Sequence, residues 1–594
     1  MNAVKSSFQS FVSRLRKNQN LRGFKFKDLP LPLIFFLISL FLVYPYFVVN
    51  LADINPFDES AYINGGRMLL DKGAWSEYGG NPLVDVFYAI TYLPFRNSPY
   101  WLIYSCELGR FLLFTLLWVS TYRVAKELER YAPPLVTMGI VLVTPVALEM
   151  LRFPSDPLFA GLAALSFWQL LSFYHTGVEK HLAFSSLFMG LAALARNDGL
   201  FSFIVLAGLT FFLSIRSRRL WVRSALVSLP FLGLVGGYIL FHGVSTGDFS
   251  LGTMHRTYEN FEVGQLIVYN APGNISSITE ARLEARRVFG TQAENHSSVF
   301  AAILRNPHVY LQRVVAVVTH LPEILLQAYG IRFMVVVFLL AVRGGIELLI
   351  RKKYGLILLF ALWPAHLLTG MVITLYREGH LLFHFYIVFI LASIGITALL
   401  ANLRNRKEVL IWSILLGLVI LAGLVGNKLA IYYGAVVFLV AYWLILVFRD
   451  RLGEINAIPA TALFILLFAG LVIRGNLPSP TLQRFGAREE GVIYLARHLA
   501  PDSIVASASP GPVWMAKMDY LGLGRMDIPR DEDSESFIAW MRKENVRAVY
   551  VDQILYNDNP AMWELLKPQI GKSLERVYSG YQGDVQVLLV KGSP

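Results

Sequence analysis

Long hydrophobic runs separated by short polar segments occupy most of the chain between residues 31 and 474. A helix needs about 20 apolar residues to cross the hydrocarbon core of a bilayer. The pattern therefore predicts a polytopic α-helical membrane protein. About thirteen spans are expected on this length rule, near residues 31–49, 100–122, 133–151, 158–174, 182–196, 200–215, 224–242, 331–350, 355–374, 382–401, 409–426, 430–448 and 457–474.

The distribution of basic residues predicts the orientation of these spans. Lys and Arg are frequent in the segment 1–30, and every second loop after the first run is basic as well. Positively charged loops stay in the cytoplasm. The segment 1–30 is therefore predicted to be a cytoplasmic N-terminus, and an odd number of spans places the C-terminus outside. The chain is expected in the inner or plasma membrane of a cell.

Three segments are long enough to form structure outside the membrane: 50–99, 243–330 and 475–594. In the last of them charges return, and helical patterns (Glu489–Leu499 and Ser534–Asn545) alternate with short apolar runs (Ile504–Ala508, Ala548–Val551 and Val585–Val590). This alternation predicts a small extracytoplasmic α/β domain. Within 243–330, the amphipathic stretches Glu280–Phe289 and Val309–Leu326 are expected to lie along the membrane surface.

Composition agrees with the membrane class. The 594 residues are 55% hydrophobic and only 16% charged, whereas an ordinary soluble domain is about a quarter charged. The net charge of +12 would suggest nucleic acid as a partner of a soluble protein. Here the basic residues lie between apolar spans, so no nucleic-acid partner is expected. The single cysteine, Cys106, excludes an intrachain disulfide.

Three carboxylates, Asp53, Asp58 and Glu59, directly follow the first apolar run. They precede a stretch with helical periodicity, Ser60–Leu70, so Asp58 or Ser60 can simply cap that helix. The alternative is a general base at the membrane surface, where a carboxylate takes a proton from a hydroxyl nucleophile. The residues alone leave both interpretations open.

Four further groups of ionisable residues lie at the outer ends of predicted spans, where charges are costly and each is a functional candidate. Each has a structural alternative: a buried ion pair, a helix start at Pro157, a basic side chain that reaches the interface, or solvated loop charges. The groups are Glu107 with Arg110, Asp156 with the preceding Arg152, Arg196 with Asp198, and Arg377 with His380 and His384.

These candidates share one predicted face of the membrane, and together they indicate a site with acidic and cationic groups. Arginine and histidine near residue 380 suit a phosphate. No HExxH, CxxC or Walker motif is present in the sequence, so nucleotide binding is unsupported.

Five loose motifs in order resemble the GT-C glycosyltransferases that use polyprenyl-phosphate sugars, and above all the bacterial relatives of protein O-mannosyltransferases and of the lipid A aminoarabinose transferase. The resemblance covers about 30–215 and resumes at Arg377-Glu-Gly-His380. The motifs are Phe-Asp58-Glu59-Ser-Ala-Tyr62, Gly-Arg110-Phe-Leu-Leu, Arg123-Val-Ala-Lys-Glu-Leu, Ser-Asp156-Pro-Leu-Phe-Ala-Gly-Leu and Ala-Arg196-Asn-Asp198-Gly-Leu.

The resemblance implies a GT-C-like transmembrane glycosyltransferase domain over 31–474 and an inverting sugar transfer. Asp58, beside Glu59, would be the base, and an acceptor hydroxyl would attack the anomeric carbon. Asp156 would be the second acid. The departing polyprenyl phosphate would be held by Arg377, His380 and Arg196, since electrostatic stabilisation of this kind usually contributes most to the rate of a reaction. Tyr62, Arg110, Asp198 and His384 complete the expected substrate contacts.

The sequence departs from the family pattern in two places. Some relatives carry a lysine before paired prolines in the first loop, where this chain has Gly80-Asn81-Pro82-Leu83. The family's Arg-Tyr pair before a proline-rich span is His380-Leu381 here. Both changes affect expected donor contacts.

The expected partners are a polyprenyl-phosphate-linked sugar, a glycan, lipid or protein acceptor, and membrane lipids. No cofactor is required, although some relatives bind a divalent metal ion; His255, His296, His308 and His320 are too scattered to predict one. The alternatives are a secondary transporter and a lipid or polysaccharide export protein. Transporters often contain internal repeats and midplane charges, and neither is seen in this sequence.

Overall fold

The structure is a computed structural model. It describes residues 31–55, 58–75, 81–128, 150–215, 217–247, 249–251, 254–265, 278–328, 331–364, 385–402, 405–426, 435–436, 439–440, 442–443, 486–523, 533–558, 560–580 and 583–592.

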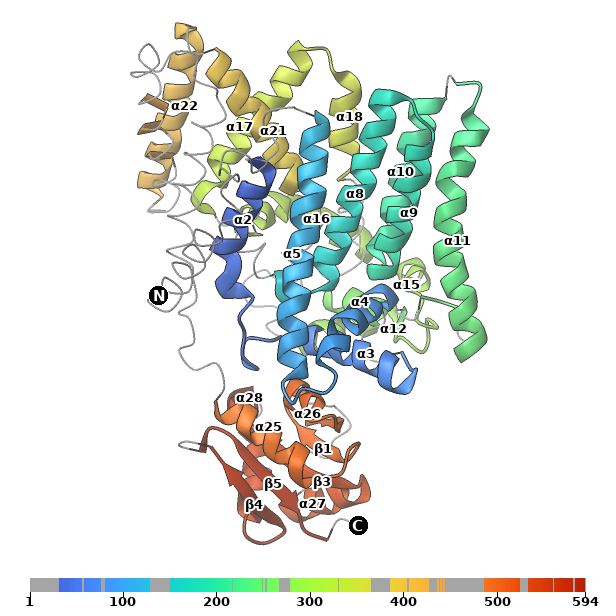
Figure 1. Ribbon diagram of the computed structural model, residues 1–594, viewed down its shortest axis with the longest axis vertical. Helices are drawn as coiled ribbons and strands as arrows, with labels where there is room; N and C mark the ends of the chain where they lie inside the picture. Colours follow the sequence, from blue (N-terminus) through green and yellow to red (C-terminus); the bar gives the residue numbers. More distant parts are fainter. Residues whose placement is uncertain are drawn as a thin grey trace, which may run out of the picture.

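Most predicted apolar runs that fall in the described ranges are helices. They form a bundle whose long axes run in roughly the same direction, with the C-terminal domain at one end (Figure 1). The helices of the bundle are α2 (Leu31–Val43), α5 (Trp101–Leu128), α8 (Ser155–Thr176), α9 (Lys180–Ala195), α10 (Asp198–Ser214), α11 (Leu220–Thr246), α17 (Ile331–Ile350), α18 (Tyr354–Leu362), α21 (Phe385–Ala401) and α22 (Arg406–Val425). Short 3₁₀ turns, η3 (Tyr44–Tyr46) and η5 (Met150–Arg152), follow α2 and precede α8.

Within the described ranges, four helices are long and apolar enough to cross a membrane: α5, α8, α11 and α22. Shorter apolar helices, such as Lys180–Ala195 and Asp198–Ser214, accompany them. The predicted runs 133–151 and 457–474 lie mostly or wholly outside the described residues. The expected number of about thirteen spans therefore stays a prediction.

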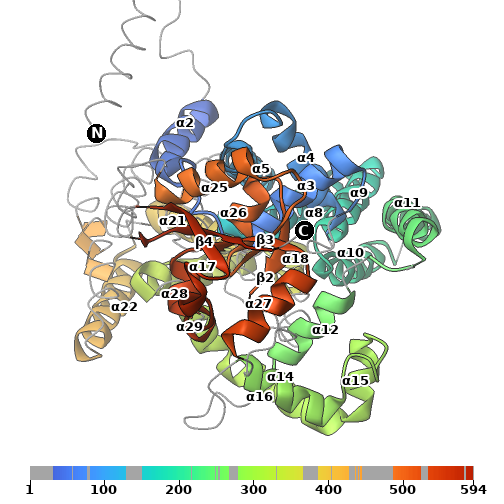
Figure 2. The ribbon, with the colours of Figure 1, turned by 90° about the horizontal axis from the view of Figure 1, so that it is seen from below.

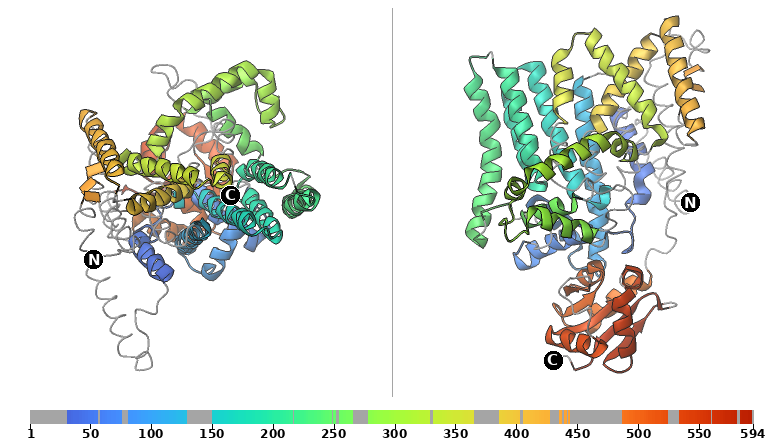
Figure 3. Two further views of the ribbon diagram at one scale, coloured as in Figure 1. Left: turned by 90° about the horizontal axis from the view of Figure 1, so that it is seen from above. Right: turned by 180° about the vertical axis from the view of Figure 1, so that it is seen from behind.

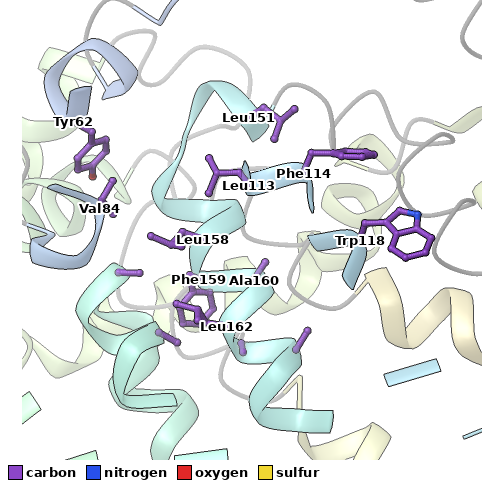
Figure 4. Packing of buried hydrophobic residues seen from close by; sticks show 14 of the residues in the cluster. Tyr62, Val84, Leu113, Phe114, Trp118, Leu151, Leu158, Phe159, Ala160 and Leu162 are labelled. Atoms are coloured by element: carbon purple, nitrogen blue, oxygen red, sulfur yellow. The ribbon is translucent and has the colours of Figure 1, made fainter. Parts of the chain in front are cut away.

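The bundle core is made of side chains from consecutive helices. α8 packs between α5 and α9, and α11 packs against α9. Figure 4 shows Leu113 and Phe114 of α5 near Leu151 and Leu158, and Phe159 is fully buried. These side chains hold the start of α8 in place.

Two glycines allow α17 and α21 to cross in close contact. A Cβ atom at Gly344 would lie 1.9 Å from the carbonyl oxygen of Leu391, and one at Gly395 would lie 2.0 Å from that of Leu340. Small residues are the usual means by which membrane helices approach this closely.

We expect Gly344→Val to push α17 and α21 apart, because the added side chain meets rigid backbone. The free energy of unfolding should fall by about 1–3 kcal/mol, as for other overpacked cores. Gly345→Val is the control, since nothing lies within 4 Å of a Cβ at Gly345. The thermal midpoint of each purified variant measures the effect, and equal midpoints would contradict this account of the crossing.

Amphipathic helices of the region 243–330 lie beside the bundle. They are α12 (Met254–Val263), α14 (Ile278–Phe289), α15 (Val299–Arg305) and α16 (Pro307–Ala328). They share a small core that contains Tyr258, Phe261 and Phe289. Both views of Figure 3 show α16 lying across the long helices rather than along them. α14 and α16 lie where the sequence predicts amphipathic stretches, whereas α12 and α15 are not predicted from it. The contact of these helices with a membrane surface stays a prediction.

The C-terminal domain contains a five-stranded mixed sheet in the order β2-β1-β3-β5-β4. The strands are β1 (Ile504–Ser507), β2 (Asp519–Gly522), β3 (Val546–Val551), β4 (Leu574–Ser579) and β5 (Gln586–Val590). β1 is parallel to both β2 and β3, whereas β5 is antiparallel to β3 and β4. Its helices are α25 (Ala487–His498), α26 (Pro510–Met515), α27 (Ser534–Lys543), α28 (Gln553–Asp558) and α29 (Pro560–Leu566), with η7 (Lys567–Gln569) after α29.

Alternate residues of β1 and β3 face opposite sides of the sheet. Ala548 and Tyr550 belong to a core shared with the helix bundle, whereas Val549 and Val551 pack with the helices α27 to α29. Figure 2 shows α25 and α26 on one side of the sheet and α27 to α29 on the other. The predicted α/β domain is therefore present, and one of its faces is turned toward the bundle.

Candidate active site

Asp58 is the first residue of α3 (Asp58–Lys72), the helix that follows the first apolar run. The side chain of Asn55 begins this helix: its Oδ1 accepts a hydrogen bond from the backbone N–H of Asp58 (3.0 Å). The N–H of Asn55 in turn donates to Oε2 of Glu59 (3.2 Å). Both carboxylates therefore lie in the first turn of α3, where the helix dipole favours negative charge.

Glu59 and Arg110 form a buried ion pair. Arg110 Nε donates to Glu59 Oε1 (2.8 Å), and its Nη2 donates to Oε2 (2.7 Å). The guanidinium also donates to the carbonyl oxygens of Tyr46 (3.0 Å) and Asp53 (3.1 Å). Glu59 is completely buried. The pair thus connects α3 to α5 and to the chain that leaves α2.

A second ion-pair group, of Asp156, Arg196 and Asp198, lies at the ends of α8, α9 and α10. Arg196 Nη1 donates to Asp156 Oδ1, and its Nε donates to Asp198 Oδ2. Asp156 is in the first turn of α8, and Asp198 begins α10. Asn197 Nδ2 donates to Thr257 Oγ1 of α12 (3.1 Å). The group therefore joins three helices of the bundle, and the adjacent Asn197 connects it to α12 beside the bundle.

Tyr62 brings α3 to this second group. It lies one turn after Asp58, is buried, and is within electrostatic range of Arg196. Its hydroxyl accepts a hydrogen bond from Asn81 Nδ2 (2.6 Å), directly before α4 (Pro82–Tyr92). We call the end of the bundle that carries Asp58, Tyr62, Asp156, Arg196 and Asp198 the sheet-proximal end.

The C-terminal domain is docked on α3 and on the start of α5. Glu489 Oε1 accepts the backbone N–H of Leu51 (2.8 Å), and its Oε2 accepts that of Gly486 (2.9 Å). The indole N–H of Trp101 donates to the carbonyl oxygen of Met515 (2.9 Å). A Cβ atom at Gly511 would lie 3.6 Å from Cβ of Ser60, two residues after Asp58. The domain thus lies directly against the helix that carries the candidate base.

Charged residues surround this contact. Lys72 pairs with Asp502 (2.8 Å), and Lys517 Nζ donates to the carbonyl oxygen of Arg96 (2.9 Å). Burial lowers the pKa of the Lys517 ammonium and also that of the Arg67 guanidinium. Arg67 donates to Asn64 (2.9 Å) and lies 6.0 Å from the centre of the Trp101 ring.

We expect Glu489→Ala to loosen the domain, because the buried N–H of Leu51 would lose its acceptor, at a cost of about 1–3 kcal/mol. Lys72→Ala is the control, since the Lys72 and Asp502 side chains are 36% and 52% exposed, and exposed pairs contribute about 0–1 kcal/mol. Hydrogen exchange at Leu51, with the thermal midpoint, measures both. A larger fall in thermal midpoint for Lys72→Ala than for Glu489→Ala would contradict the role of Glu489 in holding the domain.

Of the residues proposed from the sequence, the structure brings Asp58, Glu59, Tyr62, Arg110, Asp156, Arg196 and Asp198 to one end of the bundle. Arg377, His380 and His384 lie outside the described residues. Arg110 pairs with Glu59, while Glu107 Oε1 accepts the N–H of Val49 (3.3 Å). No described His, Cys, Asp and Glu side chains form a group of three or more that could hold a metal ion.

The sequence does not predict the partners of these residues. Asn81 and Thr257 are polar residues without a motif, and their contacts are to residues far away in the chain. Glu489 carries a local signal: it is the third helical residue after Gly486, and a glutamate there is typical of a capping box. That signal predicts a helix start and does not reveal the contact with Leu51.

The chain has an ArnT-like fold. It is similar to the aminoarabinose transferase ArnT from Cupriavidus metallidurans, in a crystal structure bound to undecaprenyl phosphate and in one of the apo state. In each comparison the TM-score is 0.54 at 15% identity, and the similarity covers 94% of this chain and 97% of ArnT. Oligosaccharyltransferase AglB from Archaeoglobus fulgidus, in complex with an inhibitory peptide and a dolichol-phosphate, gives a TM-score of 0.43 at 13% identity over 94% of this chain and 74% of its own. No family model and no curated protein match the sequence.

The likeness to ArnT confirms the predicted fold type, a mostly helical protein with several apolar candidate spans and a C-terminal mixed sheet. The apolar helices and this fold together indicate an integral membrane protein.

Proposed function

We propose that the chain is a membrane glycosyltransferase that moves a sugar from a polyprenyl-phosphate donor to a hydroxyl group of a glycan, lipid or protein acceptor. The observation that carries the proposal is the placement of α3, with Asp58 in its first turn, near the Asp156–Arg196–Asp198 group. The ArnT-like fold supports a lipid-phosphate donor, since one of those ArnT structures is bound to undecaprenyl phosphate.

In the proposed reaction the configuration at the anomeric carbon is inverted. Asp58 takes the proton of the acceptor hydroxyl, the hydroxyl oxygen forms a bond to the anomeric carbon, and the bond from that carbon to the phosphate oxygen breaks. The electron pair remains on the phosphate, where cationic groups stabilise it. Arg196 is neutralised by two carboxylates, so in this proposal it orients Asp156 and Tyr62, and other cations contact the phosphate.

The proposed orientation places the sheet-proximal end and the C-terminal domain outside the cytoplasm, in agreement with the basic segment 1–30. The C-terminal domain is proposed to bind the acceptor or to cover the site, because α26 contacts α3.

The test is sugar transfer in membranes that contain the overproduced protein, using radiolabelled polyprenyl-phosphate sugars that differ in the sugar. Transfer that depends on the protein with at least one donor supports the proposal. No transfer with any donor would favour a transporter or an export protein instead.

A further inference from the structure

Arg152 at the sheet-proximal end has no counterion among the residues that the structure describes. It ends η5, directly before α8, and its Nε is buried without a hydrogen-bond acceptor. Across the described part of the chain, its guanidinium makes no hydrogen bond, ion pair or ring contact. A buried donor that is left unsatisfied costs about 1–3 kcal/mol, so this arrangement needs an explanation.

The neighbouring arginines differ from Arg152. Arg110 is held by Glu59, and Arg196 by Asp156 and Asp198. Their charges are compensated by carboxylates of the protein, and these ion pairs connect different helices. Arg152 therefore retains its full capacity to bind an anion from outside the protein.

The position of Arg152 is fixed by its neighbours. Leu151 is buried beside Leu113 and Phe114 of α5 (Figure 4). Asp156 follows Arg152 by four residues, and a chain of this length spans at most about 14 Å. Arg152 therefore lies near the Asp156–Arg196–Asp198 group and, through it, near Tyr62 and α3.

The local field also favours an anion. α8 begins at Ser155, and the preceding Pro154 provides no side-chain cap, so the positive end of this helix dipole adds to the charge of Arg152. The carboxylate of Asp156 in the same turn is paired with Arg196, which reduces its repulsion of a second anion. A guanidinium suits a phosphate in particular, because its N–H groups can donate to two oxygens at once.

We propose that Arg152 binds the phosphate of the lipid-linked donor and stabilises the negative charge that this phosphate gains when its bond to the sugar breaks. The inference rests on the proposed function and names a donor contact in it. The phosphate of an ordinary phospholipid headgroup offers similar chemistry, and the experiment separates the two.

The experiment measures binding of three lipids to the purified full-length protein: undecaprenyl phosphate, undecaprenol and phosphatidylglycerol. The variants are Arg152→Ala and Arg152→Lys. Arg219→Ala is the matched control, because it also removes one arginine, but at the other end of the bundle, where Arg219 is 72% exposed. Thermal midpoints show that each variant is folded.

We expect the wild type to bind undecaprenyl phosphate at least tenfold more tightly than undecaprenol. Arg152→Ala should weaken binding of undecaprenyl phosphate about tenfold, as expected for the loss of a charge-assisted hydrogen bond. Binding of undecaprenol and phosphatidylglycerol should not change. Arg152→Lys should restore part of the affinity, and Arg219→Ala should behave as the wild type.

Three results would overturn the inference. An unchanged preference for the phosphate in Arg152→Ala would reject Arg152 alone and leave the proposed function intact. An equal loss for phosphatidylglycerol would assign Arg152 to ordinary phospholipid. A wild type without any preference for the phosphate would contradict both the inference and the polyprenyl-phosphate donor.

Discussion

Sugar transfer by Asp58→Asn should fall at least a hundredfold, while the protein stays folded. General bases contribute about 10²–10⁴-fold to the rate, and an amide cannot accept the proton of the acceptor hydroxyl. The substitution keeps the size of the side chain and the backbone N–H that donates to Asn55, so α3 should still form. The measurement is transfer from a radiolabelled polyprenyl-phosphate donor in membranes, with protein amount determined in parallel.

Asp53→Asn is the matched control for Asp58→Asn. It removes the same charge from the turn that precedes α3, where Asp53 Oδ2 accepts only a local hydrogen bond from the N–H of Asn50 (3.1 Å) among the described contacts. We expect transfer to stay within about threefold of the wild type, since a single hydrogen bond of this kind contributes about 1 kcal/mol to stability. Undiminished transfer by Asp58→Asn would reject Asp58 as the base.

Glu59→Gln should have the opposite effect and destabilise the protein strongly. Arg110 would keep its charge in a buried place and lose its only carboxylate among the described contacts. Breaking such a pair costs about 3–5 kcal/mol, so a clear drop in the thermal midpoint and in the yield of monodisperse protein is expected. Any loss of transfer should follow the loss of folded protein.

A double-mutant cycle with Arg110→Gln tests this interpretation. Because removal of both charges leaves none unpaired, the double variant should be more stable than the sum of the single effects predicts. Glu107→Gln is the control, as Glu107 is only partly buried and accepts a long hydrogen bond from Val49 (3.3 Å). If Glu59→Gln kept full stability and lost transfer, Glu59 would be a catalytic group, as the family resemblance implies.

Asp58 and Glu59 are neighbours in the sequence, but they are expected to have different roles, one in catalysis and one in stability. Both carboxylates occur in one motif, and both are candidates for catalysis on sequence grounds. Successive residues of an α-helix point about 100° apart, so neighbours face different surroundings. Which of them meets Arg110, which is far along the chain in α5, depends on how α3 packs, and the sequence does not contain that information locally.

In the C-terminal domain, too, the sequence predicts some elements and not others. The sequence predicts β1, β3 and β5, because continuous apolar runs are typical of strands buried on both faces. It does not predict β2 and β4, which lie at the two edges of the sheet. Edge strands are partly exposed and carry polar residues, as the exposed Glu575 and Arg576 of β4 do, so their pattern resembles that of a loop.

Several properties follow from the sequence alone, because they depend on local composition and periodicity. These are the apolar helices and most of their boundaries, the amphipathic helices α14 and α16, the presence of an α/β domain after residue 475, and the acidic and basic residues that form the candidate site. Helix-forming runs are recognised by a period of 3.6 residues and by their length, and neither depends on distant contacts.

Only the tertiary structure decided which of the described charged side chains form ion pairs within the protein and which of them do not. It pairs Glu59 with Arg110 and Arg196 with two aspartates, places Tyr62 near Arg196, docks Glu489 on Leu51 and leaves Arg152 without a counterion in the described chain. The physical reason is that the cost of burying a charge depends on which groups surround it, and those groups come from helices that are distant in sequence.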